Sequence, residues 1–178
     1  MVHIKKLKII MISIILAVIA LIPNNVLADG PSYDITNYDM DAYIQEDGTI
    51  HIDESITYYF SSSANGLTRD LRYFYKTNKD SMEPNSARYQ ATGIENITVA
   101  VTNPANITTN FTKASNAEKG DNGVYTVDAV NADRTDGYDI MVYSPISSNN
   151  FQTVHYSYDI TDAVVQYNDM SEIYYNFI

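Results

Sequence analysis

The sequence lacks cysteine and tryptophan altogether. Without cysteine the chain can form no disulfide, thiolate metal site or cysteine nucleophile, and it has no residue for bacterial lipoprotein anchoring. It also lacks a G-x-S-x-G nucleophile motif. Basic side chains are scarce, since 11 Lys and Arg stand against 22 Asp and Glu. We therefore expect no nucleic-acid partner, because an acidic surface repels phosphate backbones.

The N-terminal residues have the three parts of a secretion signal. A lysine-rich start precedes an apolar run over residues 9–22, and Ala28 ends a small-residue cleavage motif after a polar break. The rival interpretation is an uncleaved membrane anchor, but a run of fourteen residues would span only about 21 Å, short of a hydrocarbon core of about 30 Å. We therefore predict a signal peptide over residues 1–28 and an exported chain that begins at Asp29.

Removal of that signal would leave eight basic and 22 acidic side chains in residues 29–178, a formal charge of −14. Cations, basic partners or neutral polymers are compatible with such a charge. An exported domain of this size without disulfides is more typical of a Gram-positive bacterium than of an animal secretory pathway. We expect an extracytoplasmic location and a protein or glycan partner at the cell surface.

Past the signal, apolar and polar residues alternate with the period of two that is typical of half-buried strands. The runs 38–44 and 50–60 both show it. A two-residue loop between them would set Ile44 on the wrong face, opposite His51. A three-residue loop over residues 46–48, with Gly48 in the left-handed conformation, keeps the apolar faces together.

Further strands are expected at residues 67–75, 94–102, 124–130, 138–143 and 151–160. Residues 76–90 are predicted as a polar loop, 104–123 as a long excursion, and Asp136-Gly137 as the turn between two strands. Residues 163–178 are ambiguous and fit a short helical turn followed by a strand. We predict a mostly β fold, a single antiparallel β-sandwich of about seven or more strands over residues 29–178.

The hairpin register places Glu54 opposite Met40, in the middle of the apolar face, where an unpaired carboxylate is costly. Arg69 and, as second choice, Arg72 are the basic residues able to satisfy it through a charge-assisted bidentate bond. A catalytic interpretation instead makes Glu54 and Asp169 the acid and base of a glycosidase. We favour the structural ion pair and predict no catalytic residue.

Metal and cofactor sites are not predicted. A loop that resembles a calcium site precedes Gly137, but its glycine comes one position late and no bidentate Glu follows, so an acidic turn explains it more simply. Its acidic and polar members are Asn131, Asp133, Thr135 and Asp136. The mature chain's two histidines, His51 and His155, are too few for a zinc site.

Tyrosine is abundant, with sixteen residues. These side chains either form a sugar- or peptide-binding face or pack in the core with their hydroxyls at its rim, and packing is the favoured interpretation. The strand tyrosines concerned are Tyr58, Tyr59, Tyr73, Tyr75, Tyr156, Tyr158, Tyr174 and Tyr175.

Several short motifs, in this order and spacing, resemble the N-terminal domain of the predicted membrane proteins called domain of unknown function 2207. The first motifs are Asp47-Gly48-Thr49, residues 52–58 and residues 66–71 with Asp70; the last are residues 156–165 and 167–175 with Asp169 and Glu172. The resemblance covers about residues 34–178. Tyr175 stands where that family usually has Trp.

The resemblance implies an extracytoplasmic β domain followed by membrane helices, and it carries no activity. Because the sequence ends on an apolar run, we expect membrane attachment through a segment beyond Ile178. The leading hypothesis is a non-catalytic interaction or sensing module of a bacterial surface protein. The alternatives are a carboxylate-dependent enzyme that acts on envelope glycans and a calcium-stabilised, adhesin-like module.

Overall fold

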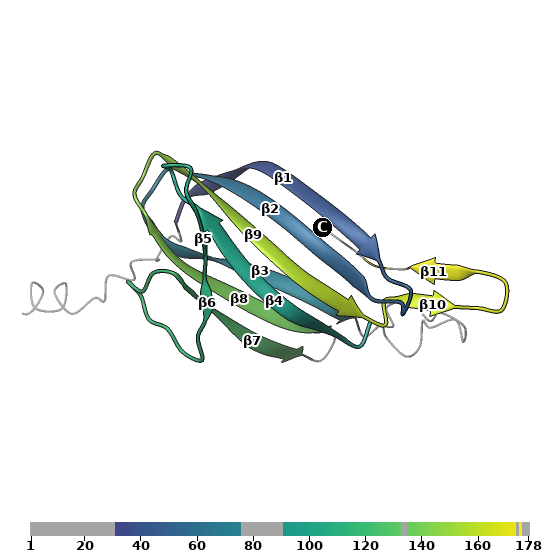
Figure 1. Ribbon diagram of the computed structural model, residues 1–178. Helices are drawn as coiled ribbons and strands as arrows, with labels where there is room; N and C mark the ends of the chain where they lie inside the picture. The colour runs from purple at the N-terminus through teal and green to yellow at the C-terminus, as the bar shows by residue number, and fades with distance from the viewer. Residues whose placement is uncertain (1–30, 76–90, 133–134, 174, 176–178) are drawn as a thin grey trace, which may run out of the picture. The chain divides into compact units, whose positions relative to one another are not determined.

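The alternating pattern becomes two β-sheets in the computed structural model, which describes residues 31–75, 91–132, 135–173 and 175. One sheet has five strands in the order β1-β2-β9-β4-β5, and the other has four in the order β3-β8-β7-β6; β10 and β11 form a separate hairpin (Figure 1). All neighbours are antiparallel except β6 and β7, which are parallel. The predicted mostly β fold is confirmed.

The strands are β1 (Tyr33–Ile44), β2 (Ile50–Phe60), β3 (Ala64–Tyr75), β4 (Gly93–Thr102), β5 (Thr108–Asn110), β6 (Thr112–Lys113), β7 (Val124–Ala132), β8 (Thr135–Ile146), β9 (Asn150–Thr161), β10 (Val164–Gln166) and β11 (Ser171–Ile173). These strands belong to one compact unit that begins at Pro31. The predicted signal peptide, the loop over residues 76–90 and Asp133 lie outside the described residues.

The hairpin between β1 and β2 has the predicted register. Ile44 lies opposite Ile50 and Met40 opposite Glu54. Gly48 has φ 86° and donates its N–H to the Gln45 carbonyl at 3.1 Å, so the loop has three residues and a left-handed glycine. Local turn chemistry therefore determines which side chains of β1 and β2 face the core.

Two sequence predictions are wrong along the middle of the chain. The excursion over residues 104–123 contains β5 and β6, which were not expected because β5 is a fully exposed edge strand without an apolar face. Asp136-Gly137 is not a turn, since both residues lie inside β8 and pair with Asn131 and Val130. Glycine is required there because a Cβ at Gly137 would lie 2.1 Å from a main-chain oxygen of β3.

The C-terminal region also differs from the expectation. Residues 164–173 form the β10–β11 hairpin and contain no helical turn. The N–H of Val164 donates to the Gly48 carbonyl at 3.2 Å, which attaches this hairpin to the loop between β1 and β2. Among the described residues no helix is long and apolar enough to cross a membrane.

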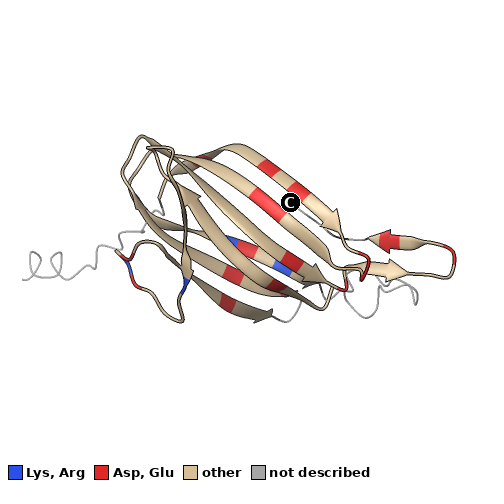
Figure 2. Cartoon of the chain, viewed as in Figure 1, with Lys and Arg blue, Asp and Glu red and all other residues tan. Residues whose placement is uncertain are grey.

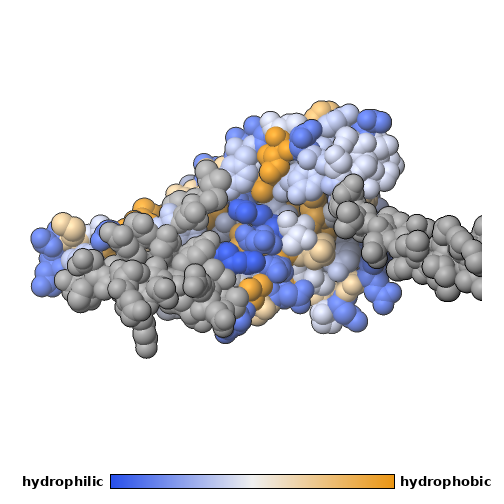
Figure 3. Space-filling model, turned by 180° about the vertical axis from the view of Figure 1, so that it is seen from behind, coloured by the Kyte–Doolittle hydropathy of each residue, from blue (hydrophilic) through white to orange (hydrophobic). Residues whose placement is uncertain are grey.

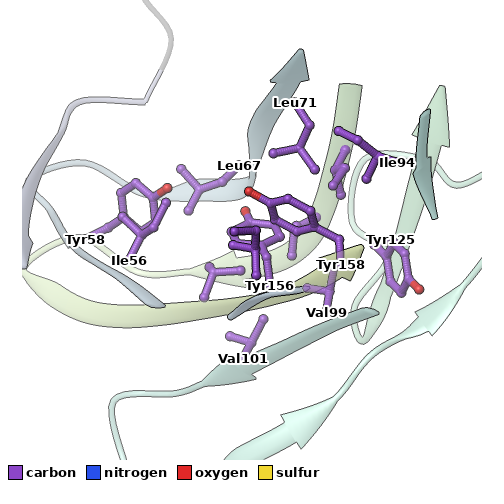
Figure 4. Close-up of a cluster of buried hydrophobic side chains, with 14 of the residues drawn as sticks. Ile56, Tyr58, Leu67, Leu71, Ile94, Val99, Val101, Tyr125, Tyr156 and Tyr158 are labelled. Carbon is purple, nitrogen blue, oxygen red and sulfur yellow. The ribbon is translucent and has the colours of Figure 1, made fainter. Parts of the chain in front are cut away.

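The core lies between the two sheets and is built largely from isoleucine, valine and tyrosine. Figure 4 shows Tyr156 and Tyr158 of β9 next to each other, with Leu67 and Leu71 of β3 across from them. Tyr156 is 1% and Tyr158 3% exposed, so both are core residues, in agreement with the interpretation that the strand tyrosines pack.

The surface carries scattered hydrophobic residues. From behind, Figure 3 shows strongly hydrophilic residues gathered near the middle of the visible face, with a few hydrophobic ones beside them. Four large hydrophobic residues of β1 are exposed, namely Tyr33, Ile35, Tyr43 and Ile44. Strand β1 is therefore less well covered than its neighbour β2, in which every second residue is buried.

Candidate functional site

Glu54, in the centre of β2, is bound by two side chains from neighbouring strands. Its side chain has no exposed surface, and Arg69 of β3 donates to both carboxylate oxygens: Nε to Oε1 at 2.9 Å and Nη2 to Oε2 at 3.0 Å. The Tyr38 hydroxyl of β1 donates to Oε2 at 2.7 Å. The structure therefore places the first-choice arginine on Glu54 and joins the two sheets through a buried, bidentate ion pair.

These contacts act on the pKa values of the groups around the carboxylate. Burial and then the bond to Glu54 raise the pKa of Tyr38, because both disfavour a phenolate beside a carboxylate. Burial is the largest single effect on Arg69 and lowers its pKa, but the hydrogen bond to Glu54 and the electrostatic attraction of Glu54 together outweigh burial and raise the pKa of the guanidinium. The Tyr38 phenol and the Arg69 guanidinium therefore both keep their protons around neutral pH.

A groove of about 740 Å³ opens above this pair, between β1 and β2 on one side and the edge of β3 on the other. Its walls are mostly aromatic and aliphatic. Tyr33 packs edge-on against Tyr58 with ring centroids 5.3 Å apart. The residues that line the groove are Tyr33, Ile35, Tyr38, Ile56, Tyr58, Thr68, Arg69 and Asp70. Such a volume, with few polar groups among apolar walls, is typical of binding sites.

The buried tyrosines Tyr58 and Tyr156 have raised pKa values. Burial raises the pKa of Tyr58 to about 12. Tyr156 is buried, and among the described residues its hydroxyl has no hydrogen-bond partner. Burial and then the neighbouring Tyr58 and Glu54 raise the pKa of Tyr156 well above the usual range. Both phenols therefore stay neutral around neutral pH, and of the two only Tyr58 lines the groove.

The second-choice arginine lies on the other face of β3. Arg72 donates from Nη2 to Asp139 Oδ1 at 2.6 Å and lies 3.7 Å from Asp70 Oδ2. Its main-chain carbonyl accepts a hydrogen bond from the Tyr175 hydroxyl at 2.9 Å. Arg72 is therefore a partner for surface carboxylates and does not contact Glu54.

The remaining motif residues lie in turns and hairpins away from the groove. Asp47 caps the β1–β2 loop, because its Oδ1 accepts the Thr49 N–H at 2.9 Å. Asp169 lies in the loop that joins β10 to β11, and Glu172 is exposed on β11 (Figure 1). The structure thus does not bring Asp169 to Glu54, as a glycosidase pair would require.

Sequence reasoning missed a polar network on the outer face of the five-stranded sheet. His51 Nδ1 lies 2.6 Å from Asp159 Oδ1, and Asn96 donates to Asp159 Oδ2 at 2.6 Å. The hydrogen bond to Asp159 raises the pKa of His51, while the bond from Asn96 and then that to His51 lower the pKa of Asp159. The network depends on the pairing of β2 with β9, which cannot be predicted from the local sequence.

A serine and a histidine also meet on this face. Ser55 Oγ lies 2.7 Å from His155 Nδ1, and Thr102 Oγ1 lies 2.8 Å from His155 Nε2, beside a hollow of about 490 Å³. A nucleophile–base pair needs a third group to stabilise the imidazolium, usually a carboxylate. Here that position holds a hydroxyl, and burial lowers the pKa of His155, so the imidazole stays neutral.

Two of the candidate calcium ligands, Asn131 and Asp136, lie on neighbouring strands. Within the described ranges, no group of three or more His, Asp or Glu side chains is arranged to hold a metal ion. Asn131 and Asp136 face each other as a cross-strand pair of β7 and β8 rather than in a calcium loop. Figure 2 shows instead that acidic positions lie side by side on β1 and β2, with no basic position on either strand.

The described residues therefore form a β domain in which a mostly apolar groove lies above a buried ion pair. The family model described as predicted membrane protein (DUF2207) N-terminal domain matches residues 34–178, and the chain belongs to that family. The matched residues include Glu54 and Arg69 and the loops that join β1 to β2 and β10 to β11. No curated protein matches the chain. No solved structure matches it either.

Proposed function

We propose that the chain is the extracytoplasmic part of a bacterial membrane protein and acts as a non-catalytic interaction or sensing module, with the groove above Glu54 and Arg69 as its binding surface. Membership of a family of predicted membrane proteins supports a role at the membrane. The lysine-rich start and apolar run of residues 1–28 support export through a cleaved signal. The absence of cysteine supports a Gram-positive source, and attachment would follow through a segment beyond Ile178.

The observation that carries the non-catalytic role is the state of Glu54. Both of its carboxylate oxygens accept hydrogen bonds, from Arg69 and Tyr38, and the side chain has no exposed surface. A general acid or base must reach the substrate proton, and a glycosidase needs a second carboxyl nearby. Glu54 offers neither, whereas apolar walls with a few polar groups suit binding.

The location is testable because the natural chain has no cysteine. Asn116→Cys would place one thiol on an exposed position, and Val142→Cys would place one at a position with 0% exposure. In intact cells, a membrane-impermeant maleimide should label Asn116→Cys and leave Val142→Cys unlabelled. Labelling of Asn116→Cys only after lysis would contradict an extracytoplasmic location.

The non-catalytic role has a separate test. Purified parent, Glu54→Gln and Ser55→Ala proteins would be incubated with cell-wall glycans, and soluble sugar release would be measured. We expect release at the background level for all three. Release by the parent that either substitution abolishes, in a variant that remains folded, would instead support the glycan-acting enzyme.

A further inference from the structure

Strand β1 is a long sheet edge that the described residues leave open. It runs for 12 residues, and within the described part of the chain it pairs only with β2. None of its residues is buried. The unpaired N–H and C=O groups of such an edge can pair with another extended chain.

This edge lacks several usual protections. Natural edge strands are blunted by lysine, proline, a short length or a bulge. β1 has neither lysine nor proline, and its irregularity between Ile35 and Asn37 leaves residues 37–44 in regular register with β2. By comparison, the main-chain carbonyl of Arg72 in the edge strand β3 accepts a hydrogen bond from the Tyr175 hydroxyl.

The open backbone groups of β1 can be located from its hairpin. Gln45 donates its N–H to the Thr49 carbonyl at 2.8 Å. Because inward and outward N–H groups alternate along an antiparallel strand, the N–H groups of Met40 and Ala42 point away from β2. The side chains of Tyr38 and Met40 belong to the face that packs on the core, so a strand added here would extend that apolar face over the groove.

Charge determines which kind of strand fits. Asp39 and Asp41 lie on the other face of β1, and Asp41 is directly opposite Asp53 of β2. Neither β1 nor β2 has a Lys or Arg to offset these carboxylates. A second copy of β1 could pair antiparallel with β1, centred on Met40, with its apolar face toward the core. This pairing would place Asp39 and Asp41 of one copy opposite the same aspartates of the other, which is unfavourable. A basic strand would be attracted instead.

We propose that β1 takes up an extended peptide segment of a partner protein as a sixth strand, with apolar residues alternating with lysine or arginine. The segment's backbone pairs with the outward groups at Met40 and Ala42. Its apolar side chains cover the groove, and its cations lie beside Asp39 and Asp41. Strand addition of this kind gives affinity through main-chain bonds and specificity through alternate side chains. The inference rests on the proposed interaction role and names its partner.

The test uses a fluorescent octapeptide, Lys-Val-Lys-Tyr-Lys-Val-Lys-Thr, titrated with the full chain while anisotropy is recorded. Saturable binding is expected, and it should weaken at higher salt. Ala42→Pro removes one outward N–H and no bond to β2, so it should weaken binding at least tenfold; Ala42→Val should not. The double change Asp39→Asn with Asp41→Asn should also weaken binding, whereas Asp128→Asn, an exposed strand aspartate of β7, should leave it unchanged.

Absence of binding by the parent chain, or equal binding by the Ala42→Pro chain with an unchanged melting curve, would overturn the inference. If Ala42→Pro is unfolded, Asp41→Lys serves in its place and should weaken binding.

Two altered peptides separate strand pairing from charge attraction. A peptide with glutamate in place of lysine should not bind, and a peptide with the four lysines in one block should bind less. Equal binding of the block peptide would indicate charge attraction alone and overturn strand addition. The maleimide labelling of Asn116→Cys is independent of these results, so the proposed location can stand if strand addition fails.

Discussion

Replacing Glu54 by Gln should destabilise the protein by breaking the buried pair while keeping the side-chain volume. The carboxylate accepts two bonds from Arg69 and one from Tyr38. The neutral amide can accept fewer of them and brings its own N–H₂ group into a site built of donors. The guanidinium would then lack its countercharge. Removing one partner of a buried ion pair typically costs about 3 to 5 kcal/mol.

The exposed fractions of the two side chains determine which substitution costs more stability. The Arg69 side chain is 23% exposed and that of Glu54 0%. In Glu54→Gln the remaining guanidinium can recover some hydration, so the cost should be near the lower bound of about 3 kcal/mol. In Arg69→Met a fully buried carboxylate keeps only Tyr38, so the cost should approach about 5 kcal/mol. The double variant should cost less than the sum, since the two side chains interact directly.

Thermal melting and urea unfolding of the purified protein measure these changes. For a chain of this size, a loss of about 3 kcal/mol should lower the melting temperature by roughly 6 to 12 °C. Glu46→Gln, at an exposed position in the hairpin loop, is the matched control and should change little. A Glu54→Gln melting curve that overlays the parent curve would refute the structural role, and a catalytic role would then be the hypothesis to pursue.

Three further predictions follow from individual contacts. Tyr38→Phe removes a hydrogen bond to the Glu54 carboxylate and should cost about 1.5 to 3 kcal/mol in urea unfolding; an unchanged midpoint would contradict this contact. Gly137→Ala would put a Cβ 2.1 Å from a main-chain oxygen of β3 and should reduce the free energy of unfolding by about 1 to 3 kcal/mol. An unchanged free energy of unfolding would indicate a surface turn instead. Burial lowers the pKa of His155, so in the unfolded chain this residue binds a proton before it does in the folded chain as pH falls through about 6.5, and its contribution to stability should decrease below that pH. His155→Gln should show a smaller decrease between pH 7.5 and 5.5 than the parent.

Local chemistry explains what could be predicted from the sequence. The loop at Gly48 fixes the register of β1 and β2, and that register alone turns Glu54 inward. Alternation along β3 then separates the two arginines: Leu67 and Leu71 are buried, Arg69 shares their parity, and Arg72 does not. Strict use of this parity would have chosen Arg69 without Arg72 as an alternative.

What could not be predicted depends on contacts between distant segments. The bond between His51 and Asp159 joins residues 108 positions apart, and its existence follows from which strand pairs with β2. The need for glycine at position 137 could not be predicted for the same reason. In sequence, Asp136-Gly137 is typical of a turn. The need for glycine there comes from the approach of β3, a strand more than sixty residues earlier.

The two long sides of the sandwich are held together differently, and this difference explains why the groove lies where it does. On one side, β5 and β6 are separated by Phe111 alone, so the chain passes directly from one sheet to the other. On the opposite side, the edge strands β1 and β3 belong to different sheets, and the side chains of Tyr38, Glu54 and Arg69 connect them. The side closed by side chains leaves the long edge of β1 and a groove of about 740 Å³ accessible, whereas on the side closed by the chain itself the edge strand β5 has three residues and the hollow beside it is about 490 Å³. The ion pair thus stabilises the flank of the domain that carries the β1 edge, and weakening the pair should affect binding at β1 as well as stability.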